Sequence, residues 1–211
     1  MGRKSKADQR RIEIIQAFSQ CVIDQGAAGS SIRKIADAAG VKPSTLHHYF
    51  KNRDEIIEEA VVYFTDRIFE DFREQVAAMG AEPGLTGTDR IDRGMEFIFS
   101  KGMINEDHTG FFLECLVVAR HNPRIKATIA DLFRRFRGAI VDHMEQIPGF
   151  ERLESPRKEL LASTIVAIHE GIELQWFVDP DRIDLARTLQ ITRDIIEFFM
   201  DRAEQSSLQG G

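Results

Sequence analysis

Residues 31–57 restrict the fold more than any other part of the sequence, because they predict two short helices joined by a tight turn. Ser31 precedes a run of apolar residues at helical spacing and is a good helix N-cap. Gly40 follows that run, at the place where the residue after a helix needs a positive φ angle. Pro43 suits the first turn of the next helix, with Lys42 as its N-cap. The segment therefore predicts a helix-turn-helix.

The second of these helices has one apolar face and one polar face without acids. At about 100° per residue, Pro43, Leu46 and Phe50 fall on the side that packs inward. The opposite side carries only side chains that can donate a hydrogen bond, namely Ser44, Thr45, His47, His48 and Lys51. Such a surface suits the phosphates and base edges of DNA. A solvated helix face with no ligand is the alternative interpretation.

A third helix is predicted to begin directly after this surface. Asn52 and Glu55 have the spacing of a capping box. Arg53 lies in the first turn, beside free N–H groups and the positive end of the helix dipole, where a DNA phosphate is the expected anion. An earlier helix, predicted to end near Gly26, completes a three-helix head.

The charge is divided unevenly along the 211 residues. Residues 1–53 hold ten Lys or Arg against four Asp or Glu, a balance of +6, whereas the remainder holds eighteen against thirty, a balance of −12. A basic head on an acidic body is expected when only one end of a chain meets a polyanion. The head begins with a basic arm that comprises Arg3, Lys4, Lys6, Arg10 and Arg11. This arm either contacts DNA or forms a disordered, solvated tail, and the sequence leaves both interpretations open.

Residues 10–57 resemble the TetR family of bacterial transcriptional regulators. The resemblance rests on the helix opening at Ser31, on IADAAGV over residues 35–41, on TLHHYF over residues 45–50, and on a basic residue in the next turn. The sequence departs from the family's usual Ser, Tyr and Lys at three positions: Lys42, His47 and Arg53.

The resemblance implies that the head binds a double-stranded DNA operator. Thr45, His48 and Arg33 are the expected base contacts, although a solvated arginine is the alternative for Arg33. The expected phosphate contacts are Ser31, Tyr49, Lys51 and Arg53, and the remaining expected contacts are Lys42, Ser44 and His47.

Beyond the head the sequence predicts further helices and no convincing strand, so the fold class is all-α with about nine helices. A long fourth helix follows the head, and later helices are expected over about 89–101, 110–121, 124–146, 155–177 and 184–203. The expected domains are a helix-turn-helix domain over residues 1–54 and a ligand-binding and dimerisation domain over residues 55–211.

The last two predicted helices are apolar over more than one stripe. A surface helix needs only one such stripe, so a wider one requires a second partner, either the core or another subunit. GIELQWFVDP, residues 171–180, resembles the end of the penultimate helix in many family members, including the choline-responsive repressor type. In the family these helices pair across a two-fold axis, which implies a homodimer on a palindromic operator.

In the TetR family the middle helices enclose a small-molecule site, and effector binding releases the heads from DNA. That resemblance implies a repressor with an effector pocket, for which the candidate residues are Phe97, Phe112, Glu114, Cys115, Phe133, His169, Glu173 and Trp176. Glu114 and Glu173 beside aromatic residues suit a cationic effector. An ordinary core residue is the alternative at each position.

An enzyme is the main alternative from another class, but the sequence offers little for it. It contains no Gly-rich phosphate loop, nucleophile elbow or CxxC motif, so no cofactor or catalytic residue is expected. His169 and Glu173, four residues apart, are the pair that would hold a metal or act as acid and base, yet such pairs are common on helices. No metal site is therefore predicted.

A dimeric ligand-binding module without a DNA role is the second alternative, and the acid-free surface of residues 44–51 argues against it. No stretch approaches the roughly 18 apolar residues of a membrane span, and no signal peptide is evident. Cys21 and Cys115 suggest no disulfide framework. The sequence therefore predicts a cytoplasmic regulator with no membrane partner.

Overall fold

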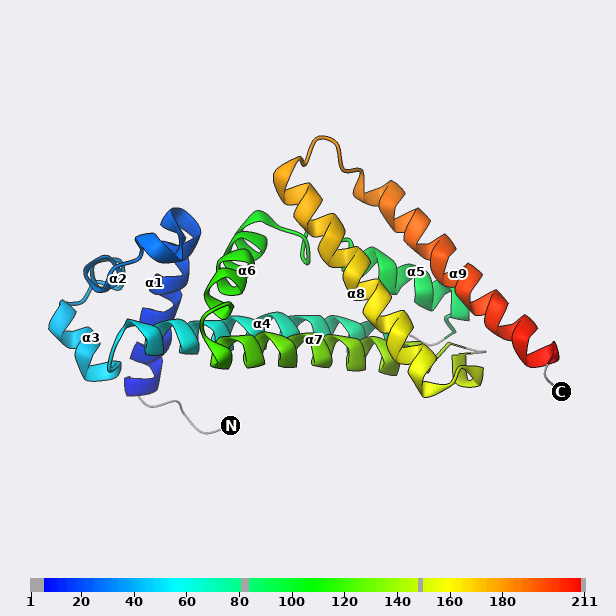
Figure 1. Cartoon of the computed structure of the whole chain (residues 1–211), viewed down its shortest axis with the longest axis horizontal. Helices are drawn as coiled ribbons and strands as arrows, with labels where there is room; N and C mark the ends of the chain where they lie inside the picture. Colours follow the sequence, from blue (N-terminus) through cyan, green and yellow to red (C-terminus); the bar gives the residue numbers. More distant parts are fainter. Residues whose placement is uncertain (1–5, 81–83, 148–149, 210–211) are drawn as a thin grey trace. The chain divides into compact units, whose positions relative to one another are not determined.

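The computed structural model describes residues 6–80, 84–147 and 150–209. Within them it contains nine α-helices, one short 3₁₀ helix and no strand, so the all-α prediction is confirmed (Figure 1). The helices are α1 (Lys6–Gly29), α2 (Ile32–Ala38), α3 (Pro43–Tyr49), α4 (Arg53–Gly80), α5 (Gly87–Ile98), α6 (Glu106–Ala119), α7 (Pro123–Met144), the 3₁₀ helix η1 (Phe150–Arg152), α8 (Ser155–Val178) and α9 (Leu185–Gln209). None of the described helices has the length and apolar character needed to cross a membrane.

The helices form two compact units. The first unit comprises Met1–Ile68 and Gly110–Asp131, and the second comprises Phe69–Thr109 and Leu132–Gly211. The helix-turn-helix belongs to the first unit, together with the start of α4 and most of α6. Helices α5, α8 and α9 belong to the second.

The turn between α2 and α3 has the predicted chemistry. The Ser31 hydroxyl accepts a hydrogen bond from the Lys34 amide and so caps α2. Gly40 has φ of 63°, a conformation that glycine adopts without steric cost. Pro43 opens α3 after the N-cap Lys42. The local signals in residues 31–43 therefore define both helices.

Gly26 breaks the regular course of α1, close to where the sequence predicts the helix to end. It has φ of 74° and ψ of 161°, and the helical residues continue to Gly29 beyond it. The backbone amide of the buried Ala27 donates to Glu114 Oε2 at 2.9 Å. The Glu114 carboxylate of α6 thus provides an acceptor for a backbone amide next to the break at Gly26.

Several helix ends differ from the prediction because a neighbouring residue takes the cap. Helix α5 begins at Gly87, two residues before the predicted position 89, because the Thr86 hydroxyl accepts from the Asp89 amide and caps the helix. Helix α6 begins four residues before the predicted position 110, since Asn105 Oδ1 accepts from the His108 amide. Helix α8, in contrast, begins at the predicted position 155, with Glu154 as its N-cap.

Two further boundaries differ from the prediction. Asn52 Oδ1 accepts from the Glu55 amide as predicted, but the Glu55 carboxylate accepts from the amide of Lys51 and not of Asn52. Helix α9 continues to Gln209, beyond the predicted end near residue 203. The predicted break at residues 148–149 lies outside the described residues.

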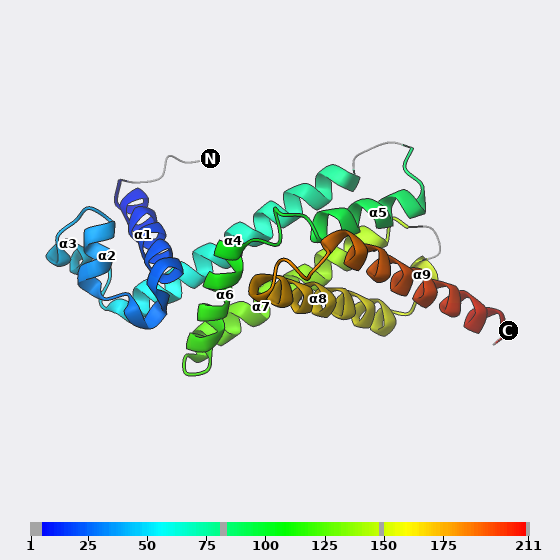
Figure 2. The same ribbon diagram turned by 90° about the horizontal axis from the view of Figure 1, so that it is seen from above.

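Aromatic side chains fill the core of the second unit between α4, α5 and α7. The Phe72 ring lies 5.0 Å from that of Phe136 and 5.7 Å from that of Phe97. Helices α8 and α9 run side by side in opposite directions in both views (Figures 1 and 2). Ile165 of α8 and Ile196 of α9 enter the same core. This packing uses only one face of each of these two helices.

Candidate nucleic-acid interface and buried carboxylate site

Helix α3 presents its polar face to solvent. Leu46 and the following Phe50 are buried and fix the helix against the rest of the head. Thr45 and Tyr49 are half-buried, and the exposed side chains of the predicted surface are Lys42, Ser44, His47, His48 and Lys51. The structure therefore brings together the exposed hydrogen-bond donors that the sequence placed on one face.

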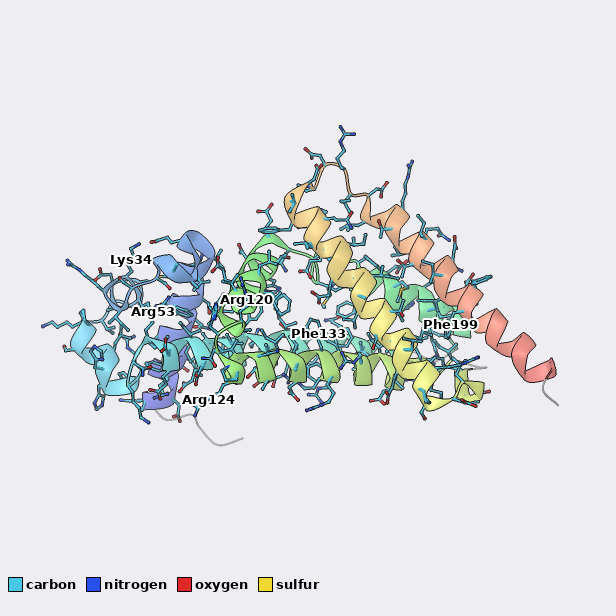
Figure 3. All side chains as sticks on the ribbon, in the orientation of Figure 1. Lys34, Arg53, Arg120, Arg124, Phe133 and Phe199 are labelled. Atoms are coloured by element: carbon cyan, nitrogen blue, oxygen red, sulfur yellow. The ribbon has the colours of Figure 1, made fainter. Side chains whose placement is uncertain are left out.

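Helix α2 contributes a smaller part of this surface. Arg33 and Ser31 are both exposed, as a DNA contact requires. The Ser31 hydroxyl already accepts from the Lys34 amide, which leaves its hydrogen available for an acceptor such as a phosphate. Lys34 projects from the same helix (Figure 3).

Arg53 has internal partners in this structure. Its guanidinium donates to the carbonyl of Ala27, to the carbonyl of Ser30 at 2.7 Å and to the Ser30 hydroxyl at 3.2 Å (Figure 3). The side chain therefore fastens the loop between α1 and α2 to the start of α4. Its predicted contact with a phosphate would require it to share or exchange these partners.

Arg11 does not belong to a free basic arm. It lies within α1 and donates to the Tyr49 carbonyl at the end of α3 and to the Glu59 carboxylate. Its guanidinium also lies over the Phe50 ring, 4.3 Å from the centroid. Arg10 is likewise inside α1 and pairs with Glu13, and Lys6 is the first residue of the same helix. The expectation of an arm separate from the helices is therefore wrong for these three residues, and Arg3 and Lys4 lie outside the described residues.

The second unit contains a cluster of polar side chains on α8 that the sequence only partly identified. His169 Nε2 lies 3.6 Å from Glu173 Oε2, and each of the two side chains is only 12% exposed. Glu170 completes the cluster, since one donor atom from each of the three residues lies within 4.8 Å of the others. From α6, the buried Thr109 hydroxyl lies 2.6 Å from Glu173 Oε1.

Burial sets the protonation of this cluster. Desolvation lowers the pKa of His169 from 6.5 to about 4, against a backbone hydrogen bond at Ile98 that raises it. The imidazole is therefore neutral at pH 7, and its contact with Glu173 is not an ion pair. Desolvation and the nearby Glu173 raise the pKa of Glu170 from 4.5 to about 7. Desolvation also raises the pKa of Glu173, although the Thr109 hydroxyl opposes the shift.

The predicted effector-pocket residues are divided between the two units. His169 and Glu173 lie together, and Phe97, Phe133 and Trp176 belong to the same second unit. The residues of α6 that belong to the first unit are Phe112, Glu114 and Cys115. Glu114 and Glu173 therefore belong to different units.

Glu114 and Cys115 have local roles in the first unit. The Glu114 carboxylate accepts from the Ala27 amide, so one of its oxygens is already engaged. Cys115 is buried, and that burial raises its pKa to about 12. Such a thiol is protonated at pH 7, and a protonated thiol is a poor nucleophile.

A small apolar cavity lies in the second unit among α4, α5, α7, α8 and α9. Its volume of about 30 Å³ is enough for a single water molecule. Phe97 lines it, as do His143, Gly94 and Ile165. A larger ligand would therefore require these side chains to move apart.

Glu170 and Thr109 are the site residues that the sequence analysis missed. The sequence showed Glu170 beside His169, but an adjacent pair on a helix does not by itself indicate one site. Thr109 lies 64 positions from Glu173 in the chain, and no local pattern connects them. Only the tertiary structure of the second unit brings this hydroxyl to the cluster.

Comparison with known proteins identifies the family of both parts of the chain. Residues 14–60 match the bacterial regulatory proteins of the tetR family, and residues 87–200 match the C-terminal part of BetI-type transcriptional repressors. The HTH-type transcriptional regulator BetI 1 of Chromohalobacter salexigens is 25% identical over 188 residues, 89% of each chain. The HTH-type transcriptional repressor KstR2 of Mycolicibacterium smegmatis is 31% identical over 168 residues, which cover 80% of this chain and 67% of that protein.

Solved structures agree with the fold. A protein described as a transcriptional regulator from Pseudomonas aeruginosa PAO1 superposes with a TM-score of 0.81 at 21% identity, over 96% of both chains. Another, from Saccharomonospora viridis in complex with choline, superposes with a TM-score of 0.71 at 20% identity, over 90% of this chain and 96% of that one. The chain therefore belongs to the TetR family of bacterial transcriptional regulators, which are not enzymes, and its C-terminal part is of the BetI type.

Proposed function

We propose that the chain represses transcription as a homodimer that binds a palindromic operator and is released by a small-molecule effector. The observation that carries the proposal is the exposed face of α3, where residues 42–51 include no acid and several exposed donors. Donors of this kind match phosphate oxygens and base edges in the major groove.

We assign separate roles to the residues of this surface. His48 and Thr45 on α3 and Arg33 on α2 are the proposed base contacts, and Lys51 and Tyr49 are the proposed phosphate contacts. Lys42, Ser44 and His47 flank them, and Ser31 can donate to a phosphate while it caps α2. Arg53 is proposed to act mainly by holding the loop before α2, because its Nε and Nη2 groups already donate to that loop.

A direct test measures binding to the DNA upstream of the chain's own gene at several salt concentrations. Replacing Lys51 by Ala should weaken binding to all sequences alike and reduce the salt slope by about one. Replacing His48 by Ala should instead relax sequence preference by about 1–3 kcal/mol. A chain that shows no salt-sensitive binding, with or without metabolite extract, would be a ligand-binding module without a DNA role.

The proposed dimer interface is the exposed apolar side of α8 and α9. Six large apolar residues remain accessible there: Leu160, Leu174, Val178, Ile191, Ile195 and Phe198. The inner face of the same helices already packs into the core, so this second stripe requires another partner. A second copy of the chain would cover it and would present two α3 helices to the two halves of a palindrome.

Sedimentation and operator binding test this interface together. Ile191 is 61% exposed, so Ile191→Asp should leave the subunit folded but shift the chain to a monomer with weakened operator binding. Ala186→Asp, also exposed on α9, is the matched control and should remain dimeric. A wild-type chain that sediments as a monomer at micromolar concentration would refute the proposed dimer.

We place the effector site in the second unit, near Phe97, Phe133 and Trp176. The small cavity lined by Phe97 supports the second unit as the location, because the core there is not completely filled, although Phe133 and Trp176 do not line this cavity. Choline is the first compound to test, because it is the ligand of the Saccharomonospora viridis neighbour. Operator binding measured at increasing choline concentration should fall if choline is the effector.

A further inference from the structure

The α8 cluster joins three potential metal ligands of two chemical kinds. His169 offers an imidazole nitrogen, and Glu170 and Glu173 each offer a carboxylate oxygen. The cluster differs from an acidic surface patch because the side chains of His169 and Glu173 are only 12% exposed. Two carboxylates placed together away from solvent repel each other unless a cation or protons balance them.

The spacing of the donor atoms fits a small ion. Zinc binds histidine nitrogen and carboxylate oxygen at about 2.0–2.2 Å, so two ligands of a tetrahedral ion lie about 3.4 Å apart. His169 Nε2 and Glu173 Oε2 are 3.6 Å apart, and all three donors lie within 4.8 Å of one another. Shifts of about 1 Å in these side chains would complete the coordination geometry.

An organic cation fits this spacing less well. The methyl groups of a quaternary ammonium ion need contacts of about 3.5–4 Å on every side, so groups on opposite sides of it lie well beyond 5 Å apart. Calcium and magnesium prefer ligand sets made of oxygen alone, whereas zinc and its first-row neighbours accept an imidazole. The donor set therefore favours a transition-metal ion.

The surroundings supply the supporting contacts that such a site needs. The Thr109 hydroxyl lies 2.6 Å from Glu173 Oε1 and can orient that carboxylate. The buried Nδ1 atom of the His169 imidazole has no hydrogen-bond partner among the described residues. The Phe99 ring lies 6.1 Å from the imidazole ring and restricts one side of it.

We propose that His169, Glu170 and Glu173 bind a divalent transition-metal ion, with Zn²⁺ as the best fit, and that Thr109 positions Glu173 for it. This site is separate from the proposed DNA surface and does not depend on the proposed function, because metal binding is measured directly. One ion is expected per subunit, bound within the second unit.

The test uses the full-length chain after treatment with a chelator. Zn²⁺ titration followed by calorimetry should give one saturable site per subunit, and Co²⁺ should give the visible absorption of a four- or five-coordinate ion. Glu170→Gln and Glu173→Gln should each weaken Zn²⁺ binding more than about 100-fold, and Thr109→Val by about 10–100-fold. Glu159→Gln, exposed on the same helix, should leave the affinity unchanged.

Three results would overturn the proposal. One is the absence of saturable Zn²⁺ and Co²⁺ binding to the folded parent chain. Another is Zn²⁺ affinity that survives in Glu170→Gln, Glu173→Gln and Thr109→Val alike, which would place the ion elsewhere. The third is choline binding that these variants abolish in a chain that does not bind Zn²⁺, which would make the cluster a site for an organic cation. Circular dichroism verifies that each variant compared is folded.

Discussion

Replacing Arg11 by Met tests whether this side chain braces α3 or binds DNA. The hydrogen bond from the guanidinium to the Tyr49 carbonyl contributes about 1.5–3 kcal/mol, as charged donors do. The contact with the Phe50 ring adds about 0.5–1 kcal/mol. The pair with Glu59 adds at most about 1 kcal/mol, because the two side chains are 31% and 35% exposed. Because these contributions are not additive and methionine retains part of the packing, we expect a loss of about 2–3 kcal/mol.

Two measurements separate the alternatives for Arg11. Urea unfolding should show the loss of stability, and titration with operator DNA should show weaker binding with an unchanged salt slope, because the guanidinium already has internal partners. Arg10→Met is the matched control, since Arg10 pairs with Glu13 on the same helix, and it should change stability by less than about 0.5 kcal/mol. The reasoning fails if Arg11→Met keeps full stability and lowers the salt slope by about one, as a lost phosphate contact would.

Three further changes have defined outcomes. Gly40→Ala should destabilise the head by about 1–2 kcal/mol in thermal unfolding, because φ of 63° strains any residue with a Cβ; an unchanged midpoint would mean that the turn adopts another conformation. Ser31→Ala should cost about 1 kcal/mol through the lost cap, whereas Ser31→Asp should retain most of it, by the same measurement. In chelator, the Glu170 carboxyl stays protonated in the folded chain between pH 4.5 and about 7, whereas in the unfolded chain it is ionised over that range. The free energy of unfolding should therefore fall as the pH rises from 4.5 to about 7. His169 changes stability in the opposite direction between pH 4 and 6.5, and it does so in the parent and in Glu170→Gln alike. In urea unfolding, Glu170→Gln should therefore show a decline that is smaller than the parent's by about 2–3 kcal/mol. Parallel pH profiles of the two proteins would contradict the assignment.

The short-range features of the head could be predicted because each depends on a few adjacent residues. A serine before α2, a glycine after it and a proline at the start of α3 act within one turn of the chain. The position of a helix end was predicted less accurately where more than one nearby residue can act as the cap. Asn105 caps α6 before the apolar run begins, so the sequence pattern placed that helix one turn too late.

The partners of charged side chains could not be predicted in the same way. Composition shows that Arg11 and Arg53 are basic, and DNA is then the obvious partner in a basic head. Both arginines instead bind carbonyl groups that lie 23 or more positions away in the sequence. For the same reason the proximity of Thr109 to Glu173 emerged only from the tertiary structure of the second unit, since helical periodicity describes a single helix.

The internal contacts of Arg53 have a consequence for the cost of operator binding. A lysine, which the family commonly has here, offers a compact charge on a flexible stem and could not reach several acceptors in a fixed plane. The planar fork of Arg53 holds the Ala27 and Ser30 carbonyls at once, so the approach to α2 is already ordered in the free protein. If the head binds DNA as proposed, less conformational entropy would remain to be lost on binding, and Arg53 would contribute through the stiffness of the loop before α2.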